Sequence, residues 1–186
     1  MLRRLVVPAL LATGLVAGSF GTAHAANVPA DEWAPKFCTA LQDWQTAIQG
    51  QSDQVTSELA GVTDLDTGRQ TIADLLGQMV DATDTTTGAL KDAGSPSTPN
   101  GAKIQTVFVN GFKAISKEFA KAQAKAEKMS TTSPTAFAKQ GKKIGTELSA
   151  SGDELGKNFD AVDKLDKGKK LENAVKAAPE CAFLNT

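Results

Sequence analysis

The stretch that decides the fold is residues 104–129, IQTVFVNGFKAISKEFAKAQAKAEKM. Its apolar residues recur every three or four positions, and this spacing places them in one stripe along an α-helix. The residues of the stripe are Ile104, Phe108, Phe112, Ile115, Phe119, Ala122, Ala126 and Met129. A single helix cannot bury such a stripe, so the rest of the chain has to supply the surface that covers it.

Three other long stretches show the same spacing and are predicted helices, at about residues 31–62, 64–92 and 134–167. The first contains Gly50, and the sequence leaves open whether residues 50–53 are a kink in one helix or a break between two. Asp64 or Asp66 is the expected cap of the second helix, and Ser133 that of the fourth. A short helix is expected at residues 171–178, because Pro179 ends its apolar pattern. Residues 93–100, AGSPSTPN, predict a flexible linker.

No stretch alternates apolar and polar residues with the period of a β-strand, so the predicted fold class is all-α. We expect one domain, residues 26–186, folded as an antiparallel up-down four-helix bundle with a short extra C-terminal helix. Four antiparallel helices return the chain to the end where it began, which brings Cys38 beside Cys181. These are the two cysteines of the chain, and a pair in an exported protein predicts a disulfide.

The first residues have the pattern of a secretory signal peptide rather than of a folded element. Arg3 and Arg4 are followed by a mostly apolar run, and Ala23-His24-Ala25 is a small-x-small cleavage site. We expect residues 1–25 to be removed after Ala25 and the mature protein to be secreted. The apolar run is short and interrupted by proline and glycine, which disfavours an uncleaved membrane anchor.

The charges are divided unevenly along the chain. Residues 26–100 contain Lys36, Arg69 and Lys91 against a long series of acidic residues, whereas residues 101–186 are rich in lysine. The formal net charge is −1 for the whole chain and about −3 without residues 1–25. One interpretation is that acidic and basic helices lie side by side in one bundle. The other is a basic binding surface.

Several classes of chemistry lack their essential side chains. The single histidine, His24, leaves with the signal peptide, and the chain has no tyrosine, so serine triads, histidine-ligated zinc and ordinary haem ligation are not expected. Asp66-Thr67-Gly68 matches the tripeptide of aspartic proteases, but it opens a predicted helix and is better explained by capping. Asp64 and Asp66 do not complete a calcium loop, because Leu75 stands where the bidentate glutamate belongs. We therefore predict no catalytic residue, no metal, no cofactor and no enzymatic activity.

Lysines repeat at intervals of four along a second face of residues 104–129. They are Lys113, Lys117, Lys121 and Lys125, and Lys128, Lys139, Lys142 and Lys143 follow them. They form either a plain solvated face or a surface for an anionic partner, such as a cell-envelope polymer, lipid head groups or an acidic extracellular protein. Membrane association would be peripheral. Nucleic acid is not an expected partner, because few aromatic residues accompany the lysines and the mature chain is net negative.

Four glycines in the fourth predicted helix need an explanation, since each costs a helix about 1 kcal/mol relative to alanine. Gly141 with Gly145, and Gly152 with Gly156, have the spacing of small-xxx-small pairs. They favour close approach of another helix, or a cavity that admits an apolar ligand, or a mobile helix.

Two tryptophans flank Cys38. The position of Trp44 in the apolar stripe predicts a core residue. Trp33 is expected either to pack over the disulfide or to be an exposed anchor for a partner, and the sequence does not decide between them.

With its A-x-A signal, the W-x3-FC of residues 33–38 and the PEC of residues 179–181, the chain resembles small secreted helical proteins of high-GC Gram-positive bacteria. The resemblance spans the chain, rests on architecture and composition, and implies location and fold but no activity. We expect an exported, non-enzymatic helical-bundle interaction protein that acts outside the cytoplasmic membrane. The alternative is a carrier that holds an apolar or lipid-like ligand between helices. The oligomeric state is left open.

Overall fold

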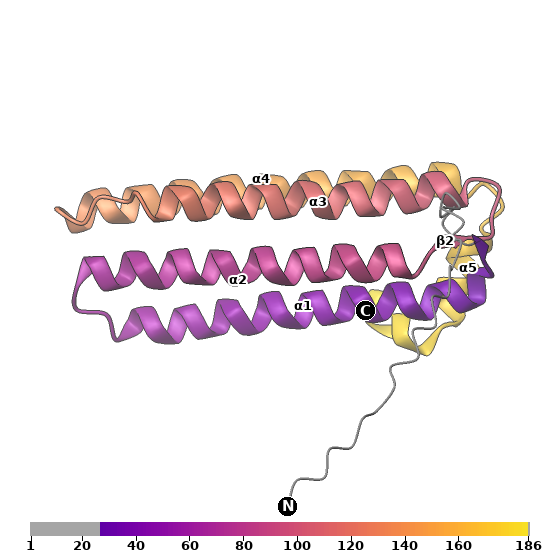
Figure 1. Cartoon of the computed structure of the whole chain (residues 1–186), viewed down its shortest axis with the longest axis horizontal. Coiled ribbons are helices and arrows are strands. Elements are labelled where there is room, and N and C mark those ends of the chain that lie inside the picture. Colours follow the sequence, from indigo (N-terminus) through magenta and orange to yellow (C-terminus); the bar gives the residue numbers. More distant parts are fainter. Residues whose placement is uncertain (1–26, 186) are drawn as a thin grey trace, which may run out of the picture.

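The apolar stripe of residues 104–129 lies mainly on α3 (Gly101–Ala126), where Ile104, Phe112 and Ala126 are fully buried. In the computed structural model, which describes residues 27–185, three further long helices cover this stripe: α1 (Ala30–Ala60), α2 (Leu65–Asp92) and α4 (Pro134–Leu165). Consecutive helices run in opposite directions and form two layers, α1 with α2 and α3 with α4 (Figure 1). The predicted all-α, up-and-down four-helix bundle is confirmed.

Each long helix packs mainly against its neighbours in the sequence. The close pairs are α1 with α2, α2 with α3, and α3 with α4. The short C-terminal helix α5 (Lys170–Ala177) and a 3-10 helix, η1 (Pro179–Asn185), pack against α1 instead. As a result the chain ends at the same end of the bundle at which α1 begins (Figure 1). We call this the disulfide end, and the opposite end, with the α1–α2 and α3–α4 turns, the turn end.

The starts of α2 and α4 follow the capping residues in the sequence. The Asp64 carboxylate accepts hydrogen bonds from the backbone N–H groups of Asp66 and Thr67, which settles which of the two aspartates is the cap. Ser133 caps α4 in front of Pro134. Residues 50–53 do not break the first helix, because α1 is continuous through Gly50 as one helix of 31 residues.

The segment between α2 and α3 differs from the flexible linker expected at residues 93–100. Ser95–Pro96 (β2) pairs in parallel with Asn27–Val28 (β1), and residues 93–96 are buried. Gly94 takes a positive φ of 75°, a conformation that glycine adopts without strain and that turns the chain toward this pairing. The prediction is wrong for the first half of the segment, because proline, serine and glycine mark a turn without showing whether other residues pack on it.

The buried residues form two clusters along the bundle. The cluster at the disulfide end contains Trp33 and Phe37 of α1 with Phe108 and Phe112 of α3. The cluster at the turn end contains Leu76, Met79 and Ile144. Between the two, α2 carries buried threonines whose hydroxyls donate to the carbonyl four residues earlier, as Thr83 does to Met79 at 2.7 Å. The Trp44 indole N–H donates to the Thr83 hydroxyl at 3.0 Å. Trp44 was predicted to be a core residue; in the structure it is half-buried and packs against the core cluster.

Candidate functional site

The predicted disulfide joins Cys38 of α1 to Cys181 of η1. Their Cα atoms are 5.0 Å apart, and both residues are fully buried. The bond fixes the C-terminal segment to the beginning of α1, so α5 and η1 form a wall at this end of the bundle. The predicted signal peptide, residues 1–25, lies outside the described residues.

Trp33 is not an exposed anchor. It is fully buried, its ring stacks on Phe37 with centroids 4.6 Å apart, and its indole N–H donates to the Gly94 carbonyl at 2.8 Å. The alternative of an exposed anchor is therefore wrong, and Trp33 packs in the interior against Phe37. The hydrogen bond also ties α1 to the segment that follows α2.

The glycines of α4 are not sites of close helix approach. A Cβ atom placed on Gly145, Gly152 or Gly156 would meet no atom within 4 Å, and one on Gly141 would meet only the end of the Met129 side chain at 3.7 Å. The close-packing explanation is wrong because α4 packs on α3 through another face, where Ile144 and Leu155 are buried. Nor do these four glycines line any of the cavities described below.

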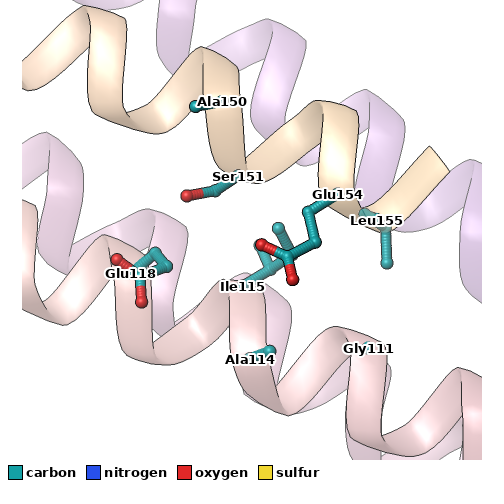
Figure 2. Close-up of a pocket in the computed structure, with 8 residues that line it drawn as sticks. All are labelled: Gly111, Ala114, Ile115, Glu118, Ala150, Ser151, Glu154 and Leu155. Carbon is teal, nitrogen blue, oxygen red and sulfur yellow. The ribbon is translucent and has the colours of Figure 1, made fainter. Parts of the chain in front are cut away.

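A hollow of about 400 Å³ lies between α3 and α4. Figure 2 shows Ser151 and Glu154 reaching from α4 toward the side of α3 that carries Glu118. Two carboxylates at one hollow are the arrangement that an acid–base enzyme would need. However, Glu118 accepts a 2.6 Å bond from Lys121, and the Ser151 hydroxyl donates to the Glu147 backbone carbonyl at 3.0 Å. The hollow therefore offers no serine hydroxyl directed at a base.

The predicted lysine stripe is exposed on α3, but half of it is paired within the fold. Lys121 pairs with Glu118 on the same helix, and Lys125 with Glu147 of α4 at 2.5 Å. The hydrogen bond from Lys125 lowers the pKa of Glu147. Lys113 and Lys117 have no ion-pair partner among the described residues.

A second group of lysines surrounds the α3–α4 turn. We call it the basic tip, and it consists of Lys125, Lys128, Lys139, Lys142 and Lys143. All five are exposed and border two shallow hollows, one of which has an apolar floor of Met129 and Ile144. Within residues 27–185, only Lys125 of this group makes an ion pair. Four of the five lysines of the basic tip are therefore exposed without an ion-pair partner among the described residues.

An apolar cavity of about 300 Å³ opens at the disulfide end between α1, α4 and α5. Its floor is aromatic: Phe108 lies against Phe37 and Phe159, with ring centroids 4.5 and 5.3 Å apart. Val175 of α5 and Leu184 of η1 lie on its other side. Leu184 is 47% exposed and is the one exposed large apolar side chain in the described part of the chain.

The sequence did not reveal this cavity, because Phe159, Val175 and Leu184 belong to three separate elements, α4, α5 and η1. They meet because the disulfide folds the C-terminal segment back on α1. The cavity lies one turn beyond Gly156, toward the C-terminal end of α4, and not beside the glycines where a ligand cavity was expected.

Two acidic residues, Asp66 and Asp166, have structural partners within the fold. Asp66 pairs with Arg69 at 2.9 Å, and the buried Asp166 accepts hydrogen bonds from the backbone N–H groups of Leu171 and Glu172 at the start of α5. No group of three or more histidine, cysteine or acidic side chains suited to a metal ion occurs among residues 27–185. In the same residues, no helix combines the length and apolar character needed to cross a membrane.

Comparison of the chain with protein-family models, with curated proteins and with solved structures gave no match.

Proposed function

We propose that this chain is an exported, non-enzymatic interaction protein that acts outside the cytoplasmic membrane and binds an anionic partner through its basic tip. The observation that carries the proposal is the separation of charge between the two helix layers. Residues 26–100, which contain α1 and α2, have 3 basic and 11 acidic residues, whereas residues 101–186 have 15 and 10. Among the described residues, no ion pair joins the α1–α2 layer to the α3–α4 layer.

The lysines of the tip therefore face solvent, where they can attract an anionic surface. Such attraction is long-range at low ionic strength and falls off when the salt concentration shortens the Debye length to about 10 Å or less. Export is supported by the signal-peptide pattern of residues 1–25 and by the disulfide, which is typical of proteins outside the reducing cytoplasm.

The test is titration of the mature protein with polyglutamate and with polyphosphate at low and high salt. Lys139, Lys142 and Lys143 are replaced together by glutamine, and the matched control replaces Lys157, Lys164 and Lys167, which are exposed on or just after the C-terminal half of α4. We expect the tip variant to bind about tenfold more weakly and the control to bind like the wild type. Equal weakening in both variants would show that only net charge matters, and would contradict a binding site at the tip.

A carrier of apolar ligands is the second candidate function, and the cavity at the disulfide end is the observation that favours it. Its volume of about 300 Å³ is at the lower end of the range for small-molecule sites, and its aromatic floor is typical of them. Extraction of the purified protein with organic solvent, followed by mass spectrometry, would reveal a ligand that copurifies.

A further inference from the structure

We propose that the cavity between α1, α4 and α5 binds a single-chain amphiphile with a cationic head group, whose chain lies on the aromatic floor and whose head lies beside Asp163. The inference rests on the carrier candidate and names its ligand class. Three properties of the cavity support it: its size and lining, the position of Leu184, and the charges at its edge.

The size and lining select an apolar group of moderate bulk. The volume of about 300 Å³ is about twice that of an engineered apolar cavity that accommodates benzene. The floor combines Phe37, Phe108 and Phe159 with the ring of the buried Trp33. The free energy falls when an alkyl chain or a ring displaces water from such a surface.

The position of Leu184 points to an occupant at the mouth. This side chain borders the cavity and is 47% exposed, whereas the other large apolar side chains of the described residues are at least half-buried. Cys181 holds η1 on α1, so Leu184 stays near the cavity. An apolar chain in the cavity would cover this exposed surface as well.

The charges at the edge select the head group. The charged residues that line the cavity are Asp163, Asp166, Glu172 and Lys176. Glu172 is paired with Lys176 at 2.5 Å and with Lys169 at 3.3 Å, and Asp166 is occupied by two backbone N–H groups. Asp163 is exposed and has no ion-pair partner in the described part of the chain. A cationic head is attracted to this carboxylate and an anionic one is repelled.

The test compares two ligands with the same chain and opposite heads, decyltrimethylammonium and decyl sulfate, each titrated below its micelle-forming concentration. Calorimetry measures the affinity, and the fluorescence of the cavity residue Trp33, isolated by Trp44→Phe, reports occupancy. We expect the cationic ligand to bind about tenfold more tightly. Asp163→Lys should abolish or reverse this preference, whereas the control Asp153→Lys, the same charge change at another exposed site on α4, should preserve it.

The outcomes separate the inference from the function on which it rests. Binding of both ligands with equal affinity would overturn the assignment of a cationic head and leave the carrier candidate standing. Absence of binding by either ligand would overturn both. Equal loss of preference in Asp153→Lys would show that the overall charge, and not the cavity edge, selects the head. Leu184→Arg, at an exposed position, provides a second check, because it should weaken binding of the cationic ligand without disturbing the fold.

Discussion

Breaking the Cys38–Cys181 bond is the perturbation whose effect can be worked out most directly. The bond joins residues separated by 143 positions, so it closes almost the whole described chain into one loop. In the chain-entropy model, closing a loop of this size lowers the entropy of the unfolded chain by about 17 cal/mol/K, equivalent to about 5 kcal/mol at 25 °C. Native disulfides contribute about 2–5 kcal/mol in practice, so we expect a loss of about 3–5 kcal/mol. That is a large fraction of the stability of an ordinary domain.

The assay is urea unfolding of the oxidised and the reduced protein, with Cys38→Ala/Cys181→Ala as a third sample. Both cysteines are fully buried, so the alanine variant also loses packing of the two sulfur atoms. The reduced wild type keeps those atoms and isolates the effect of the cross-link. Hydrogen exchange should in addition show that residues 170–185 lose protection first, because α5 and η1 pack mainly on α1 and on each other. An unchanged unfolding midpoint with α5 still protected would refute the reasoning.

Three further predictions concern single residues. Gly145→Ala and Gly152→Ala should each raise the free energy of unfolding by about 0.5–1 kcal/mol, because their Cβ atoms enter open space. Gly101→Ala should lower the free energy of unfolding by about 3 kcal/mol, because its Cβ would clash with the Pro96 carbonyl oxygen. Thermal and urea unfolding measure all three variants, and stabilisation by Gly101→Ala would contradict the structure. Trp33→Phe should cost about 2–4 kcal/mol in urea unfolding, because it leaves the buried Gly94 carbonyl without its donor, and a neutral effect would show that the indole is not buried as described. Hydrogen bonds from the Thr67 backbone N–H and hydroxyl, and from the Asp66 N–H, lower the pKa of Asp64. The ionised Asp64 therefore stabilises the fold above the unfolded aspartate pKa of about 3.9, and this stabilisation is lost as the pH falls through the lower folded pKa. Asp64→Asn keeps a cap but should lose less stability on acidification, and a pH profile of unfolding identical to that of the wild type would rule out this role of Asp64.

Much of the fold could be predicted because its determinants are local. The apolar spacing of residues 104–129 places the core stripe of α3, and Asp64 and Ser133 mark the starts of α2 and α4 because a cap acts within its own first turn. The disulfide was predictable for a different reason. The chain has only two cysteines, and an even number of antiparallel helices brings the chain ends together.

The wrong predictions concern packing and burial that depend on residues far away in the sequence. The spacing of Gly145, Gly152 and Gly156 is a property of one helix, and it cannot show that α4 turns these residues away from its neighbour. The proline-rich residues 93–100 predict a turn, but their burial depends on Asn27–Val28 and Trp33, far away in the sequence.

Of the two candidate sites, the basic tip could be predicted in part from the sequence, and the cavity could not. The lysines of the basic tip could be named from the sequence, because charged residues near a helical turn remain exposed in most packings. Which of them are neutralised could not be predicted, since the Lys125–Glu147 pair joins two helices. The cavity could not be predicted at all. Its walls come from α1, α3, α4, α5 and η1, and only the disulfide-fixed C-terminal segment closes it.

Native and denaturing mass spectrometry of the protein recovered from the culture medium of a bacterial host is the measurement that tests the account most directly. We expect a chain that begins at Ala26, is lighter than the reduced chain by two hydrogen atoms, and carries a non-covalent ligand or partner that is lost on denaturation. A protein that is retained in the cells, keeps residues 1–25 and has two free thiols would contradict it.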